Sequence, residues 1–292
     1  MKKSAASSVL FLSQETDYSM RIDKLFADNG FGSRRDIKRL LHSRAVEVNG
    51  VVCADASFRV DPERDVFTVE GKPFRPRTTV YLMLNKPAGV ITSTDDPTHR
   101  TVMDLLAPPW SLMDLFPVGR LDLDTEGLLV LTNDGPLTHR LTSPKTGVNK
   151  TYLAVLRDPV DEAAFARYDA ALRTGITFHD GYTCLPALLA RADNTGCHTD
   201  SDANAEHVPS TPRVQSSLHV PSIPLNDPYR AVLLTIREGK YHQVKKMFKA
   251  LGNEVVYLKR VSMGSLYLDP ALAPGAWREL TQDEALLLRE GV

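Results

Sequence analysis

The feature that most constrains this chain is a short apolar run, Leu128–Leu131, followed by the turn signal Asn-Asp-Gly at 133–135. A short, continuous apolar run bounded by such a signal indicates a buried strand. Three carboxylates precede the run at a spacing of two residues: Asp122, Asp124 and Glu126. In an extended backbone this spacing directs all three side chains to one face. We therefore expect a buried strand that is preceded by three acids whose side chains lie on one face.

Several roles are open for these acids. They could bind a metal, but hard cations need several oxygen ligands and the nearby chain supplies few others. They could form a general acid/base pair, or they could be ordinary loop residues in solvent. The remaining possibility is one acid with a cationic partner, and Lys245 is a candidate because it borders the apolar stripe of a helix expected at 241–252. A close lysine would keep a buried aspartate ionised, and an ionised aspartate in a dry cleft can act as a nucleophile.

Length and composition indicate an ordinary globular protein of two domains. The chain has 292 residues, of which 42% are hydrophobic and 24% charged. No apolar run reaches the roughly 18 residues of a membrane span. The apolar patch at 9–12 is shorter than the core of a signal peptide, so we expect a disordered tail at 1–19 and a cytoplasmic protein.

The net charge of −1 does not suggest nucleic acid, but the distribution of charge does. Residues 32–44 carry five basic side chains against one acid, and residues 237–260 carry seven against two. Two basic clusters on a nearly neutral protein are typical of a surface that binds a polyanion.

The first basic cluster lies in a compact unit expected at 20–71. Apolar spacing predicts a helix from Arg21 to Gly30 and a second helix that begins at Ser33 with a capping box. A hairpin with an Asn-Gly turn at 49–50 follows. A solvated helix face is one interpretation of the basic residues, but like charges four residues apart destabilise a helix slightly unless they have a partner. We expect four of them to bind RNA: Arg34, Arg35, Lys38 and Arg39.

After a linker at 72–79, residues 80–292 alternate short strand patterns, turns and a few helices, which predicts an α+β fold. We expect strands on both sides of a turn at 86–89, and a helix at 161–172. A polar segment at about 191–227 has no apolar period and is expected to be a disordered insertion. We expect no metal site at Cys197, His198 and His207, which lie inside it.

The unit at 20–71 resembles the S4 RNA-binding domain (αL type), through "MRIDKLFADNGFGSRRDIKRLLHSRAVEVNG" and the strand-rich "FRVDPERDVFTVEG". In that family the second helix and the hairpin bind structured RNA through its phosphates. The resemblance therefore implies the same use of the basic face.

The larger unit resembles the pseudouridine synthases, and within them the group that modifies ribosomal RNA. Four stretches carry the resemblance: "YLMLNKPAGVITSTDDPTHRTVMDLL", "GRLDLDTEGLLVLTNDG", "KTYLAVL" and "EGKYHQVKKMFKALGNEVVYLKRVSMGSLYLD". The resemblance implies a mixed, mostly antiparallel sheet with flanking helices.

The resemblance also implies roles for particular residues. Asp122 matches the catalytic aspartate, and Arg120 is the arginine beside it. Tyr152 matches the tyrosine that packs on the target base, and Lys245 matches the basic partner of the aspartate, where many relatives have arginine. Asp124 and Glu126 have no catalytic role in the family. We also expect three lysines to bind RNA: Lys86, Lys246 and Lys249.

The implied reaction detaches uracil from its ribose, turns it and rejoins it through carbon, so we expect no cofactor and no metal. The expected substrate is a uridine of 16S ribosomal RNA, within a small-subunit assembly intermediate, and we expect a monomer with no membrane partner. Three alternatives remain open: a sister synthase acting on 23S ribosomal RNA, a non-catalytic S4-type assembly factor, and an N-glycosidase that would release free uracil.

Overall fold

The structure is a computed structural model that describes residues 19–192 and 230–290. The chain divides into two compact units between Thr78 and Thr79. Most of the expected tail and insertion lies outside the described residues, as do Cys197, His198 and His207. The predicted start of the insertion at 191 falls inside a strand, because Arg191 closes strand β11 and donates to the carbonyl oxygen of Val160 at 2.6 Å.

Over the described residues 19–78, the first unit has two helices and two small sheets. Helix α1 (Ile22–Asp28) and helix α2 (Arg34–His42) pack on the sheet in the order β3-β2-β5-β6. Its strands are β2 (Val46–Val48), β3 (Val51–Val52), β5 (Phe67–Val69) and β6 (Lys72–Phe74), while β1 (Met20–Arg21) pairs with β4 (Arg59–Val60). The predicted capping box is confirmed: the Ser33 hydroxyl accepts from the backbone N–H of Asp36, whose carboxylate accepts from the Ser33 N–H.

The first unit extends further along the chain than the sequence indicated. Strand β6 lies in the segment that we expected to be a linker. Its Phe74 packs against Phe26 and Phe31, with ring centroids 5.4 and 5.0 Å away. The unit needs this aromatic side chain to complete its small core, which the polar composition of the segment does not reveal.

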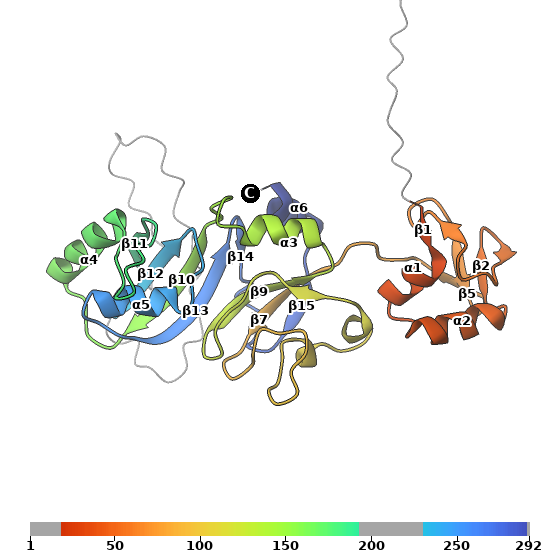
Figure 1. Cartoon of the computed structure of the whole chain (residues 1–292), viewed down its shortest axis with the longest axis horizontal. Helices are drawn as coiled ribbons and strands as arrows, with labels where there is room; N and C mark the ends of the chain where they lie inside the picture. Colours follow the sequence, from red (N-terminus) through yellow and green to blue (C-terminus); the bar gives the residue numbers. More distant parts are fainter. Residues whose placement is uncertain (1–18, 193–229, 291–292) are drawn as a thin grey trace, which may run out of the picture. The chain divides into compact units, whose positions relative to one another are not determined.

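The second unit is built on a mixed sheet in the order β11-β12-β10-β13-β9-β7-β15, shown in Figure 1. All neighbouring pairs along it are antiparallel except β13 and β9, which are parallel. The strands are β11 (Leu188–Arg191), β12 (Ala231–Ile236), β10 (Lys150–Leu156), β13 (Val255–Met263), β9 (Glu126–Thr132), β7 (Tyr81–Lys86) and β15 (Trp277–Glu279), with β14 (Leu266–Tyr267) on β13 and β8 (Phe116–Pro117) on β9. The expected α+β class and mostly antiparallel sheet are confirmed.

Strand β9 is buried on both faces, as its apolar run predicts. Leu129 and Leu131 belong to one hydrophobic cluster, whereas Leu128 and Val130 belong to another. Successive side chains point to opposite faces of a strand, so two covered faces require an unbroken apolar run. The Asn-Asp-Gly signal ends the strand and also begins helix α3 (Gly135–Thr142), because the carboxylate of Asp134 accepts from the N–H of Leu137 at 3.0 Å.

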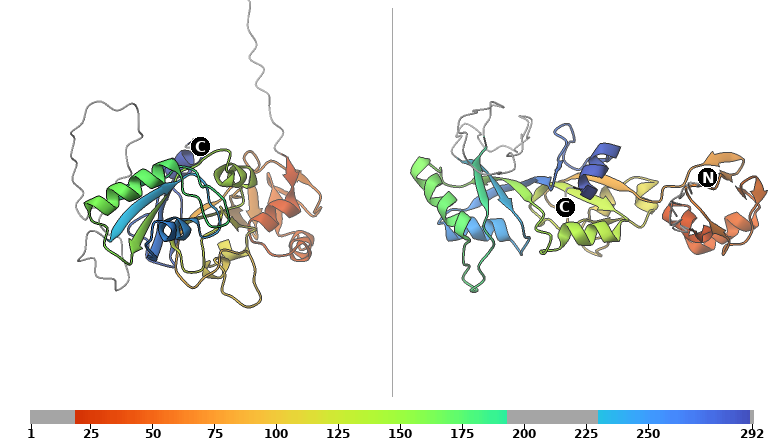
Figure 2. Two further views of the ribbon diagram at one scale, coloured as in Figure 1. Left: turned by 60° about the vertical axis from the view of Figure 1, so that its left-hand side comes forward. Right: turned by 90° about the horizontal axis from the view of Figure 1, so that it is seen from above.

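Four helices cover the two faces of the sheet. Helix α4 (Glu162–Thr174) and helix α5 (Gln243–Ala250) contribute to the first cluster and gather near β11 and β12 in Figures 1 and 2. Helix α3 and helix α6 (Gln282–Glu290) contribute to the second cluster. The strand expected after the turn at 86–89 is wrong, since Ile91 makes only an isolated bridge with Thr101.

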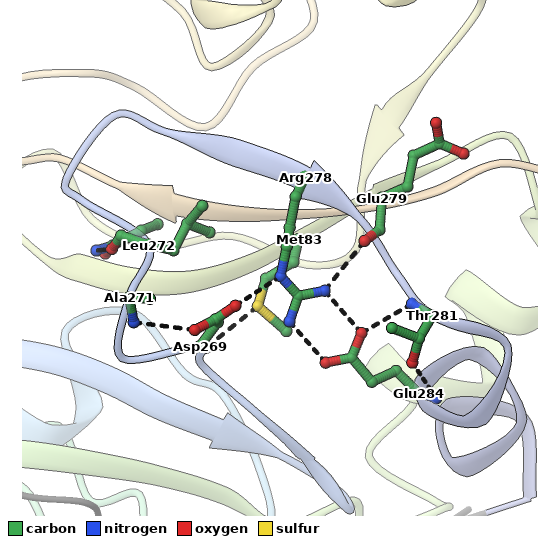
Figure 3. A network of polar contacts seen from close by, with 9 residues as sticks. Met83, Asp269, Ala271, Leu272, Arg278, Glu279, Thr281 and Glu284 are labelled. Atoms are coloured by element: carbon green, nitrogen blue, oxygen red, sulfur yellow. Dashed lines mark hydrogen bonds and ion pairs between the residues drawn. The ribbon is translucent and has the colours of Figure 1, made fainter.

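A charged network fixes the C-terminal part of this unit (Figure 3). The guanidinium of Arg278 on β15 donates to Asp269 at 2.7 Å and, through two nitrogens, to the carboxylate of Glu284 at 2.7 Å. Glu284 also accepts from the N–H of Thr281 at 2.9 Å. Arg278 thereby holds the pKa of Glu284 below its usual range and ties the start of α6 to the sheet.

Candidate active site

The three acids at 122, 124 and 126 do not form a row, because the backbone that carries them turns. The N–H of Thr125 donates to the carbonyl oxygen of Asp122 at 3.1 Å, which closes a turn between them. This turn interrupts the alternation expected of an extended chain. As a result Asp122, Asp124 and Glu126 have different surroundings, and the shared face predicted from their spacing is wrong.

A buried lysine holds the loop at 122–125 in place through hydrogen bonds to its backbone. The ammonium of Lys86, at the end of β7, is fully buried and donates to the carbonyl oxygens of Asp122, Leu123 and Thr125 at 2.9–3.3 Å. Burial lowers the pKa of Lys86 to about 8, although the carboxylates of Asp124, Glu126 and Asp122 oppose the shift. The expectation that Lys86 binds RNA is therefore wrong, because the side chain is not accessible and acts on the loop instead.

The carboxylate of Asp122 lies at the start of helix α5. Its Oδ1 is 3.7 Å from Nε2 of His242, and the Asp122 side chain is 29% exposed. His242 has a left-handed backbone with φ of 53° and immediately precedes the first residue of α5. An imidazole at this distance stabilises the carboxylate when protonated. His242 was not predicted from the sequence, although it stands only three residues before Lys245.

Lys245 points into the same region but pairs with a different acid. Its Nζ donates to both carboxylate oxygens of Asp124 at 2.6 Å. Burial would raise the pKa of Asp124, but the hydrogen bond and charge of Lys245 outweigh it and lower the pKa. The expected pairing of Lys245 with Asp122 is thus not what the structure shows: the turn at Leu123 brings Asp124 to the lysine.

Glu126 is buried, so the interpretation that it is a solvated loop residue is wrong. It is 8% exposed and accepts a hydrogen bond from the hydroxyl of Tyr257 at 2.9 Å. Burial and then the neighbouring carboxylate raise the pKa of Tyr257. Burial also lowers the pKa of Lys259, and Glu126 opposes that shift. Glu126 therefore belongs to the interior of the sheet where β9 meets β13.

The other two expected site residues differ in accessibility. Arg120 is exposed, two residues before Asp122. Tyr152 lies on β10 opposite Arg260 and is only 7% exposed. It shares a hydrophobic cluster with Leu121, with Leu84 of β7 and with the buried face of α5, so all four stretches that carry the family resemblance meet in one core. A base could contact only the small accessible part of the Tyr152 ring.

The remaining lysines and arginines expected to bind RNA lie on helices. On α5, Lys249 is exposed, and Lys246 is half-buried with its Nζ 4.0 Å from Asp180. On α2 the four expected residues are exposed, although the guanidinium of Arg39 pairs with Asp36. Helix α2 therefore presents accessible positive charge.

Metal-ligating and membrane-spanning features are absent from the described part of the chain. Within residues 19–192 and 230–290, no three His, Cys, Asp or Glu side chains converge in a way that could hold a metal ion. Nor do these two ranges contain a helix long and apolar enough to cross a membrane.

Comparison with known proteins identifies the family. Residues 80–250 match the family model of RNA pseudouridylate synthase, and residues 20–66 match the S4 domain. The chain belongs to the RNA pseudouridine synthase family. The matched region contains β7, the loop that Lys86 supports, β9, β10 and α5.

Relatives of this pseudouridine synthase match it over nearly the whole chain. An uncharacterized RNA pseudouridine synthase of Bacillus subtilis is 45% identical, over 93% of this chain and 99% of that protein. Ribosomal small subunit pseudouridine synthase A of Escherichia coli is 37% identical, over 91% of this chain and 98% of that protein. A crystal structure of a pseudouridylate synthase is 35% identical and has a TM-score of 0.56, over 92% of this chain and 99% of that one. The chain is therefore an RNA-modifying isomerase with an N-terminal S4 domain.

Proposed function

We propose that this enzyme converts a uridine of small-subunit (16S) ribosomal RNA to pseudouridine, with Asp122 as the catalytic carboxylate. The observation that carries the proposal is the position of Asp122. It is partly accessible, its backbone is clamped by buried Lys86, and its carboxylate faces the start of α5. The name and near-complete coverage of the Escherichia coli relative support the small subunit as the source of the substrate.

The chemistry needs an ionised carboxylate beside the target nucleoside. The bond between uracil and ribose breaks, the base turns, and a carbon–carbon bond replaces the carbon–nitrogen bond, so no electrons are gained or lost. Asp122 attacks either the sugar or the base to hold the fragments together. His242 lies close enough to stabilise its charge, and the ion pair between Asp124 and Lys245 links the loop to α5. The uridine must first leave its stack in the RNA.

The two units divide the work in this proposal. Helix α2 supplies phosphate contacts and affinity, while the second unit supplies the reaction. Arg120 is accessible for the RNA backbone near the target, and Tyr152 contacts the base through the small part of the residue that is accessible. On α5, Lys246 and Lys249 add positive charge. We further propose that the enzyme acts in the cytoplasm as a monomer, on an assembly intermediate of the small subunit.

The test compares two neighbouring acids with the same substitution. Asp122→Asn keeps shape but loses the charge and the attacking oxygen, so pseudouridine formation should fall below detection. Asp124→Asn loses only a partly exposed ion pair worth about 1 kcal/mol or less, and should keep most activity. Both variants should bind RNA as the wild type does. Single-turnover pseudouridine formation on 16S RNA or an assembly intermediate, with binding measured in parallel, decides between them.

Substantial turnover by Asp122→Asn, or equal loss in both variants, would refute the assignment. Pseudouridine mapping in a deletion strain, with and without the restored protein, tests the substrate. A missing pseudouridine in 23S RNA would indicate the sister activity. No change in either RNA would indicate an assembly factor, and release of free uracil by the purified enzyme would indicate a glycosidase.

A further inference from the structure

An exposed aromatic ring stands directly beside the candidate active site. Tyr241 is 70% exposed, among the largest values for a bulky apolar or aromatic residue in the described part of the chain. Its ring stacks on that of His242, with centroids 3.8 Å apart and 18° between the planes. His242 supports one face of the Tyr241 ring, and most of the residue is nonetheless exposed to solvent.

The segment that carries Tyr241 is held by a buried polar network. Gln243 is 3% exposed, accepts from the N–H of Lys240 at 2.9 Å, and donates to the carboxylate of Glu238 at 2.7 Å. Glu238, also 3% exposed, accepts in addition from the N–H of Leu185 at 2.7 Å. Tyr241 therefore projects from a turn whose two sides are fixed, and its ring loses little freedom when a ligand stacks on it.

Position and charge indicate what kind of ligand the ring would bind. Through His242, the ring is linked to the carboxylate of Asp122, 3.7 Å from the imidazole. The ammonium of Lys246 lies 5.6 Å from the centroid of the Tyr241 ring. This ammonium is also 4.0 Å from the carboxylate of Asp180, and its side chain is partly exposed. An exposed aromatic ring with a lysine over it suits an unstacked base and its phosphate, because the long lysine side chain can move from the ring to the phosphate. Tyr152, at 7% exposure, cannot offer a whole ring face.

We propose that Tyr241 is the stacking platform for a base adjacent to the target uridine, and that Lys246 pairs with the phosphate next to it. This inference rests on the proposed function, since it takes the substrate to be RNA whose uridine reaches Asp122. The platform would hold the strand open on one side of the extruded uridine. Its contribution is binding, because the stacked base does not react.

The variants are Tyr241→Ala and Tyr241→Phe, with Tyr267→Ala as the control. Tyr267 is a partly exposed tyrosine on β14, at 42% exposure. Base stacking on an aromatic ring is worth about 1–3 kcal/mol, so Tyr241→Ala should raise the RNA concentration for half-maximal single-turnover rate by about 5- to 150-fold. The maximal rate should be unchanged, because an interaction made equally in ground and transition states affects only binding. Tyr241→Phe and Tyr267→Ala should behave as the wild type.

A wild-type concentration dependence in Tyr241→Ala would overturn the proposal. Loss in Tyr241→Phe equal to that in Tyr241→Ala would also overturn it, because stacking does not need the hydroxyl.

A second measurement separates this inference from the proposed function. In the Tyr241→Trp variant, a short uridine-rich single-stranded RNA should quench the fluorescence of the introduced indole. The wild type measures the background fluorescence of Trp110 and Trp277. Quenching by an enzyme that makes no pseudouridine would refute the function and support the platform. Wild-type pseudouridine formation without quenching would refute the platform and leave the function standing.

Discussion

The buried ammonium of Lys86 makes a quantitative prediction about stability. Its folded-state pKa is about 8, against an ordinary value of 10.5, because burial disfavours the charged form. Between these two pH values the unfolded chain binds more protons than the folded one, so the free energy of unfolding rises with pH. Each pH unit contributes up to about 1.4 kcal/mol, and the whole interval about 3 kcal/mol. Below pH 8 the cost of burying the charge is present in full.

The perturbation is Lys86→Met, which keeps the length of the side chain and removes the titration. The free energy of unfolding of the wild type minus that of the variant should rise by about 3 kcal/mol as the pH rises from 8 to 10.5. Tyrosines with a raised pKa, such as Tyr81 and Tyr182 at about 12, titrate in both proteins and cancel in this difference. The variant should also turn over more slowly, since the loop of Asp122 loses its clamp.

Urea unfolding at a series of pH values, followed by tryptophan fluorescence, measures this difference. Both tryptophans, Trp110 and Trp277, belong to the second unit and report its unfolding. Lys145→Met is the control, because it removes an exposed lysine of the same unit by the same substitution. A difference between wild type and Lys86→Met that stays flat with pH would refute the reasoning.

Two further predictions concern the sheet and the S4 domain. Gly127→Ala should destabilise the second unit by about 3 kcal/mol or more, because φ is 101° and a Cβ would stand 2.2 Å from the carbonyl oxygen of Arg260. Gly181→Ala is the comparison, because φ there is 81° but a Cβ would meet no atom within 4 Å, so this variant should lose only about 1 kcal/mol of stability. Thermal melting measures both variants, and equal losses of stability would contradict the prediction. Four residues of α2 should be replaced together by alanine: Arg34, Arg35, Lys38 and Arg39. RNA binding should weaken, and the slope of log affinity against log salt concentration should flatten by up to about one unit for each phosphate that is no longer neutralised. An unchanged slope would exclude these residues from the interface.

The sequence predicted those elements whose signal is local. The capping box at Ser33, the stripe of α5 and the run of β9 each depend on residues within a few turns or a few positions, and the structure confirms all three. The ordered stretches around Asp122 and α5 also predicted the family correctly. The strand expected after the turn at 86–89 does not form, because a β pattern forms a strand only where a neighbouring strand accepts its hydrogen bonds.

Side-chain partners were harder to predict, as Lys245 illustrates. Periodicity places Lys245 at the edge of a buried stripe, but the acid that it meets depends on the turn at 122–125, and that turn brings Asp124 to it. A signal for Lys86 was present, because it ends a six-residue strand buried throughout, where an ammonium must find acceptors inside the protein.

The sequence by itself therefore determined the two units, most of their elements and the family, and the resemblance to that family is what points to Asp122 as the candidate catalytic aspartate. These depend on chain-local periodicity, capping and the order of motifs, which the covalent sequence contains directly. Only the tertiary structure decided that Lys86 supports the loop from within and that His242 is the near neighbour of Asp122. Those contacts join residues far apart in the chain, so they exist only after the strands have paired and brought the loop of Asp122 to the start of α5.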